Sequence, residues 1–167
     1  MRPDRRQAFG MILGGAAALS LPVRAVETSE TLLTLRNLRL SGAHGSILFD
    51  RAGLEEMPWQ TVETGNPFVD HVATFRGPSA FGVASQIGHA GARQVRLIAA
   101  NDYFTEVELS ELDRFDAILA MEMNGRPLTL RDYGPIWVMY PLDLYSELQD
   151  SVYNSRLVTQ LRVMELF

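Results

Sequence analysis

Residues 117–141 read AILAMEMNGRPLTLRDYGPIWVMYP, and this stretch decides the fold. Asn124-Gly125 is the strongest short turn signal in the chain, and it separates the apolar run 116–123 from residues 126–130. Such a dipeptide between two extended runs predicts a β-hairpin. After a second turn at Tyr133-Gly134-Pro135, residues 136–140 are strand formers that end at Pro141. The stretch therefore predicts a hairpin followed by a strand, and alternation along residues 136–140 leaves open whether one face of that strand is exposed.

Outward from this stretch, the chain alternates short apolar runs with turn residues. These runs predict further extended segments at residues 32–40, 47–50, 59–63, 72–75, 95–100, 104–109 and 157–166. Capping residues predict short helices at 51–57, 80–87 and 110–113, and the polar segment 143–155 is a further helix candidate. Pro78 is expected at the start of the helix over 80–87, and Gly88 at its end. We predict an α+β, mainly β, mixed-sheet domain with a few short helices.

The first 25 residues have the pattern of a secretory signal peptide. A basic start, RPDRR at residues 2–6, precedes the apolar run 8–21, and Pro22 and Ala25 follow in a cleavage-site pattern. The motif RRQAF at residues 5–9 resembles a twin-arginine signal. The alternative is a retained anchor helix, although the apolar run is short for a membrane span. We expect residues 26–167 to be one domain, periplasmic or secreted, with no transmembrane span.

The charge of this mature segment excludes several classes of partner. Without the four arginines and one aspartate of residues 1–25, the 15 basic and 20 acidic residues become 11 and 19, a formal charge of −8. Nucleic acid and anionic lipid head groups both select basic surfaces, so neither is expected as a partner. The chain contains no cysteine, so no disulfide can stabilise it.

Four segments in order resemble one family, the molybdopterin-binding domain of sulfite oxidases and their bacterial relatives. They are Phe75-Arg76-Gly77-Pro78 with the helix after it, residues 97–103 (LIAANDY), residues 119–128 (LAMEMNGRPL) and residues 131–141 (RDYGPIWVMYP). The resemblance covers nearly all of residues 26–167. It implies a sulfite-oxidase-type molybdopterin-binding fold.

The departures from this family concern its cofactor. In catalytic relatives a metal-ligating cysteine lies close to where this chain has residues 61–67, TVETGNP. Molybdenum held by a dithiolene prefers a soft anionic donor, whereas Glu63 is a hard oxygen donor. The family's histidine and arginine near the end are Tyr133 and Trp137 here. The resemblance therefore implies no metal ligand and, as the expectation, no cofactor, with molybdopterin as the less favoured alternative.

Seven residues remain as a candidate ligand-binding pocket. Tyr103 falls where catalytic relatives place an active-site tyrosine, and its alternative interpretation is a turn aromatic that covers the core. Arg76 and Arg131 could pair with an anion, or with Asp102 and Asp132. The full candidate set is Arg76, Asn101, Asp102, Tyr103, Arg131, Tyr133 and Trp137.

No catalytic residue is predicted. His44, His71 and His89 are not spaced for chelation. Asp70-His71 could be a base with an orienting carboxylate, but the sequence has no serine motif or cysteine that it could activate. Glu106 and Glu108 alternate with apolar residues, which is typical of a solvated strand face.

Three functional hypotheses follow. The favoured one is a secreted, non-catalytic molybdopterin-binding-domain-like protein, a ligand-binding or accessory module for a small ligand or a periplasmic or membrane protein. The alternative is a molybdopterin-dependent oxidoreductase that holds its cofactor without a cysteine, in a deep arginine-lined cavity. The third is a structural domain whose own side chains fill the pocket.

Overall fold

The computed structural model describes residues 30–167, apart from the side chains of residues 43 and 44. The signal-like segment 1–25 and the side chain of His44 therefore lie outside the described residues. Five strands form the larger sheet, in the order β2 (Ser46–Phe49), β1 (Leu33–Asn37), β11 (Leu161–Leu166), β5 (Gln94–Ala99) and β6 (Phe104–Glu108). β1 and β11 run parallel, with Thr34 opposite Val163, and the other neighbours are antiparallel.

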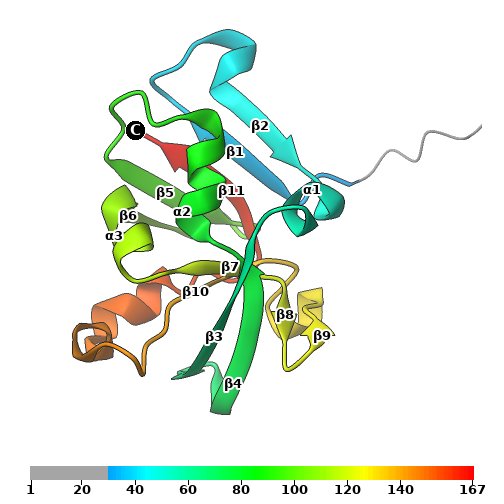
Figure 1. Ribbon diagram of the computed structural model, residues 1–167, viewed down its shortest axis with the longest axis vertical. Coiled ribbons are helices and arrows are strands. Elements are labelled where there is room, and N and C mark those ends of the chain that lie inside the picture. The colour runs from blue at the N-terminus through cyan, green and yellow to red at the C-terminus, as the bar shows by residue number, and fades with distance from the viewer. Residues whose placement is uncertain (1–29) are drawn as a thin grey trace, which may run out of the picture.

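A long hairpin dominates the second sheet. The hairpin consists of β3 (Trp59–Asn66) and β4 (Val69–Pro78). The sheet is completed by β8 (Glu122–Met123) and β9 (Arg126–Pro127). A separate pair joins β10 (Trp137–Met139) to β7 (Ile118–Ala120). Figure 1 shows the hairpin projecting downward from the five-stranded sheet.

The helices are short and lie between strands. The α-helices are α1 (Arg51–Glu55), α2 (Ala80–Ala84) and α3 (Leu109–Arg114). The 3-10 segments are η1 (Gly42–Gly45), η2 (Ser85–Ile87), η3 (Leu130–Asp132), η4 (Ser146–Gln149) and η5 (Ser151–Arg156). Asp50 caps α1 through the N–H of Gly53, and Ser79 caps α2 through the N–H of Gly82. No helix within residues 30–167 is long and apolar enough to span a membrane.

The predicted fold class is confirmed: the domain is mainly β, with mixed sheets and a few short helices. The Asn124-Gly125 turn is also confirmed, with φ of 51° and 74° between β8 and β9. The prediction of one strand over 116–123 is wrong, because the chain changes sheets at Met121, whose N–H bonds to the Arg76 carbonyl at 2.8 Å. β7 then pairs with β10, and β8 pairs with β4.

Other boundaries also differ from those predicted. Residues 143–155 do not form one helix, because Asp150 is extended between η4 and η5 and caps the latter through Val152 N. The helix begins at Ala80 as predicted, but Pro78 belongs to the end of β4 and not to the helix start. The last strand begins at Leu161, since Gln160 has a positive φ of 50°.

The core is continuous between the sheets, and its largest fully buried side chains include Trp137, Tyr140, Phe75 and Phe115. Strand alternation left open an exposed face for residues 136–140, but all five are fully buried. The closeness of β4 to β7 depends on Gly77, where a Cβ atom would stand 1.9 Å from the Leu119 carbonyl oxygen.

Candidate functional site

The turn between β5 and β6 presents Tyr103 at the surface. The Asn101 side-chain oxygen accepts the Tyr103 N–H at 3.1 Å, and Asp102 takes a left-handed φ of 64°. This is an Asx-type turn, which explains the Asn and Asp locally. Tyr103 is 45% exposed, and its hydroxyl donates to the Ser155 carbonyl of η5 at 2.8 Å.

Beside Tyr103 lies a pocket of about 200 Å³, which we call the Tyr103 pocket. It forms where the tip of the β3–β4 hairpin, the β5–β6 turn, and the end of η5 with the segment after it meet. Its lining is Phe68, Ala99, Asn101, Tyr103, Asn154, Ser155, Leu157, Val158 and Thr159. None of these side chains is charged, so the pocket is suited to a neutral group.

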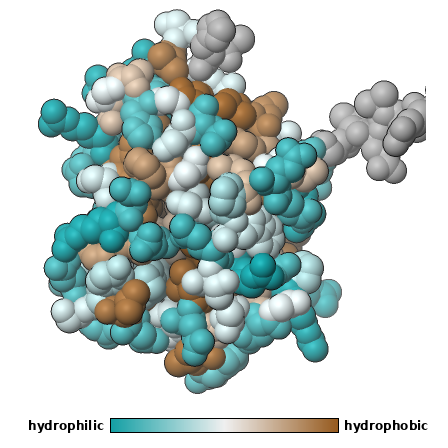
Figure 2. All heavy atoms as spheres, viewed as in Figure 1, coloured by the Kyte–Doolittle hydropathy of each residue, from teal (hydrophilic) through white to brown (hydrophobic). Residues whose placement is uncertain are grey.

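Aromatic rings connect this pocket to the core. The ring centroid of Phe68 lies 5.8 Å from that of Tyr133 and 5.8 Å from that of Trp137, and Tyr133 and Trp137 lie 4.9 Å apart. Trp137 is fully buried and donates its indole N–H to the Leu157 carbonyl at 3.2 Å, whereas Phe68 and Tyr133 are 42% and 37% exposed. Figure 2 shows apolar residues at the surface of the lower end of the molecule, the end that carries the hairpin in Figure 1.

The structure brings together only part of the predicted site. Asn101 and Tyr103 line the pocket, and Tyr133 and Trp137 adjoin it through Phe68. Sequence reasoning missed Phe68, although a phenylalanine directly after Asn66-Pro67 in a tight connection was a usable signal.

The two predicted arginines do not converge on this pocket. Arg76 pairs with Glu122 at 3.2 Å and lies 5.7 Å from the ring centroid of Trp59. Arg131 is exposed in η3 and, like Asp102, does not line the Tyr103 pocket. The suggested pairing of these arginines with Asp102 or Asp132 is not formed, and Asp132 instead accepts the Thr129 hydroxyl at 2.7 Å.

Residues 64 and 65 lie in the segment where the resemblance places the cysteine of catalytic relatives, and both are hydrogen-bonded to Asp143. Asp143 accepts the Gly65 N–H at 2.6 Å, and the buried Thr64 hydroxyl oxygen accepts the Asp143 N–H at 3.3 Å. The side-chain groups that could contact a metal here are the Thr64 hydroxyl, the Asp143 carboxylate and the Asn66 amide, whose Nδ2 is buried without a partner. This set lacks a soft anion and does not fit a thiolate-ligated molybdenum centre. Among the described residues no three or more His, Asp or Glu side chains gather to hold a metal ion.

A partly buried polar network links η5, which carries two of the pocket-lining residues, to α3. Glu111 accepts the Tyr140 hydroxyl at 3.0 Å and forms an ion pair with Arg156, whose guanidinium lies 4.5 Å from the Tyr153 ring centroid. Burial raises the pKa of Tyr140 well above its ordinary value, and the Glu111 charge raises it further. Burial lowers the pKa of Arg156, but its hydrogen bond and attraction to Glu111 outweigh this and leave that pKa raised. The network holds the segment that supplies Asn154 and Ser155 to the pocket.

The mixed sheets with their long hairpin have a counterpart among solved structures. The chain is similar in fold to a sulfane dehydrogenase. Its structure superposes on that of the sulfane dehydrogenase SoxCD from Paracoccus pantotrophus with a TM-score of 0.60, at 14% sequence identity, over 81% of this chain. The match covers 37% of the SoxCD chain, so this chain spans well under half of that length, and at this identity the likeness shows the fold alone.

No family model matches the sequence, and no curated protein matches it.

Proposed function

We propose that this chain is an exported, non-catalytic module with a sulfite-oxidase-type fold, which binds a small neutral ligand or a periplasmic protein partner at the Tyr103 pocket. The fold similarity to a sulfane dehydrogenase supports descent from a catalytic scaffold. The observation that carries the proposal is the contact of Asp143 with Thr64 and Gly65, which occupies the segment where catalytic relatives carry their metal ligand.

The geometry of Tyr103 also favours binding over catalysis. Its hydroxyl is engaged by the Ser155 carbonyl, so the phenol proton already has an acceptor within the fold. A tyrosine that acts as a general acid needs its proton within hydrogen-bond reach of the substrate. The residue as a whole, in contrast, is 45% exposed, so its ring is available for stacking.

The size and lining of the pocket define what it would bind. Pockets that enclose drug-sized ligands hold about 300–1,000 Å³, and this one holds about 200 Å³. Its neutral lining and the adjacent rings of Phe68 and Tyr133 suit one planar or apolar group. An aromatic side chain of a partner protein is such a group, because aromatic anchors in small pockets dominate many interfaces.

The alternative is a molybdopterin-dependent oxidoreductase without a cysteine ligand, and the fold similarity is its supporting observation. It requires a large cavity lined by arginines. The Tyr103 pocket is small and none of its lining residues is an arginine, so this pocket does not meet the requirement.

Isolation of the protein from its native host tests the cofactor. Elemental analysis and mass spectrometry of released small molecules should find neither stoichiometric molybdenum nor a pterin. Stoichiometric molybdenum together with a pterin would overturn the proposal. The same preparation tests export, since N-terminal sequencing of periplasmic material should begin at Val26.

A titration with indole tests the pocket. In amide-detected NMR of the whole chain, indole should shift the signals of Phe68, Tyr103 and Ser155. Phe68→Ala should abolish these shifts, whereas Leu48→Ala, which removes a side chain that is 64% exposed on the distant edge strand β2, should preserve them. Equal shifts in both variants would rule out the Tyr103 pocket as the binding site.

A further inference from the structure

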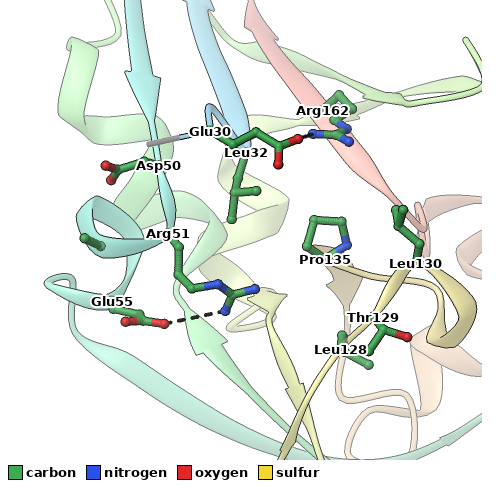
Figure 3. A pocket seen from close by; sticks show the side chains of 11 residues that line it. Glu30, Leu32, Asp50, Arg51, Glu55, Leu128, Thr129, Leu130, Pro135 and Arg162 are labelled. Atoms are coloured by element: carbon green, nitrogen blue, oxygen red, sulfur yellow. Dashed lines mark hydrogen bonds and ion pairs between the residues drawn. The ribbon is translucent and has the colours of Figure 1, made fainter. Parts of the chain in front are cut away.

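A second depression, of about 540 Å³, lies on another part of the molecule, where the chain enters β1 (Figure 3). Its apolar floor is formed by Leu32, Leu128 and Pro135, and α1 forms one wall. It shares no lining residue with the Tyr103 pocket. Its volume falls in the range of about 300–1,000 Å³ that is typical of small-molecule sites. We call it the β1 groove.

Two arginines line this groove from different elements, and both are loosely paired. Arg51 of α1 stands 3.5 Å from Glu55, and Arg162 of β11 stands 4.0 Å from Glu30. Figure 3 shows the Arg51 guanidinium extending toward the open centre, with the Arg162–Glu30 pair above it and Pro135 on the opposite side. Ion pairs of this length and exposure contribute little to stability, so a ligand can replace either partner at small cost.

The charges of the groove select the ligand. Besides the two arginines it carries Glu30, Glu55 and Asp50, and Asp50 caps α1 through Gly53 N at 2.8 Å. A simple anion bound to Arg51 would lie close to the Glu55 carboxylate and be repelled by it, and a simple cation bound to Glu55 would be repelled by Arg51. A ligand that carries both charges satisfies both members of the pair that it separates. The apolar floor then takes an uncharged body.

From this pattern we propose that the β1 groove binds a short apolar peptide with a free α-carboxylate and a free α-ammonium group. The carboxylate lies against the guanidinium of Arg51, the ammonium group lies against the carboxylate that Arg51 releases, and the apolar side chains cover Leu32 and Leu128.

Calorimetric titration of the full chain with dileucine tests this site. Three probes are compared: dileucine, N-acetyl-dileucine and dileucine amide. Because a hydrogen bond between charged groups is lost when either end is blocked, each blocked peptide should bind roughly tenfold more weakly or worse. Equal affinity for all three peptides, or no heat of binding with any of them, would overturn the proposal.

Two variants locate the site. Arg51→Gln should weaken dileucine binding and should remove most of the difference between dileucine and its amide. Arg114→Gln is the matched control, since it breaks an exposed ion pair with Glu147 that does not line the groove. If both variants bind dileucine like the unaltered chain, the groove is not the site. Because the two pockets share no lining residue, either result leaves the indole test of the Tyr103 pocket independent.

Discussion

The carboxylate of Asp143 accepts a hydrogen bond from the backbone N–H of Gly65, with 2.6 Å between the two heavy atoms. The two residues are 78 positions apart in the chain, and the contact joins the end of β3 to the segment after β10. A second bond, from Asp143 N to the buried Thr64 hydroxyl oxygen, closes the pair. Asp143 thus holds residues 64 and 65, which lie in the stretch where the resemblance puts the metal-ligating cysteine of catalytic relatives.

Asp143→Ala should lower the free energy of unfolding by about 1 kcal/mol, because a charge-assisted bond is lost at an exposed position. Urea unfolding followed by circular dichroism measures this change. Asp113→Asn is the control, since Asp113 is an exposed carboxylate in α3, and its effect should stay within about 0.5 kcal/mol. A loss for Asp143→Ala no larger than for the control would mean that the contact contributes nothing to stability.

Glu111 and Arg156 should be strongly coupled. Their side chains are only 13% and 19% exposed, and removal of one partner leaves the other charge partly buried. Glu111→Gln and Arg156→Gln should each destabilise the chain by about 2–4 kcal/mol, less in the double variant than the sum of the two. A double-mutant cycle in urea measures the coupling energy. Strict additivity of the two losses would contradict a direct ion pair.

Tyr140 should make the protein lose stability at alkaline pH. Burial, and then the Glu111 charge, raise the pKa of this phenol in the folded state. Its contribution is therefore complete below about pH 10, and above that pH the unfolded chain releases a proton that the folded chain keeps. The free energy of unfolding should fall by at most about 1.4 kcal/mol per pH unit from this group.

Tyr140→Phe should make the alkaline decline shallower, as measured by urea unfolding between pH 9 and 11. Tyr145→Phe, which alters a neighbouring aromatic of the same region, should keep the original slope. The slopes are compared rather than the absolute stabilities, because Tyr140→Phe also removes a hydrogen bond to Glu111. An unchanged slope in Tyr140→Phe would contradict the raised pKa.

Gly77→Ala should prevent stable folding or cost about 3 kcal/mol or more, since the new Cβ would stand 1.9 Å from the Leu119 carbonyl oxygen. Gly65→Ala on the partner strand is the matched control. Its Cβ would meet Asp143 Oδ2 at 3.5 Å and Val72 at 3.9 Å, which are ordinary contacts. Its stability should stay within about 1 kcal/mol of the unaltered chain, and thermal unfolding of both variants compares them.

Local signals predicted the features that depend on neighbours in the chain. Asn124-Gly125 predicted a hairpin turn because both residues tolerate a positive φ, and both adopt one. Gly88, with φ of 71°, ends the helical segment at the predicted place. Glu106 and Glu108 lie exposed on one face of β6, as alternation indicated.

Contacts between distant residues account for what sequence reasoning missed. Met121 divides a continuous apolar run because its N–H bonds to the carbonyl of Arg76, a residue that is far away in the chain and belongs to a different sheet. Arg76 meets Glu122 because β4 pairs with β8 in a register that no local signal encodes. Phe68 joins Tyr103 only because the hairpin tip folds against the turn after β5.

The sequence by itself determined a mainly-β domain with short helices, its main turns and the lack of a thiolate, because these follow from backbone preferences and residue chemistry. Only the tertiary structure decided which side chains share a pocket and which charges form pairs. Those outcomes depend on strand register and on packing between residues far apart in the chain, such as Gly65 and Asp143, and neither carries a signal of the other.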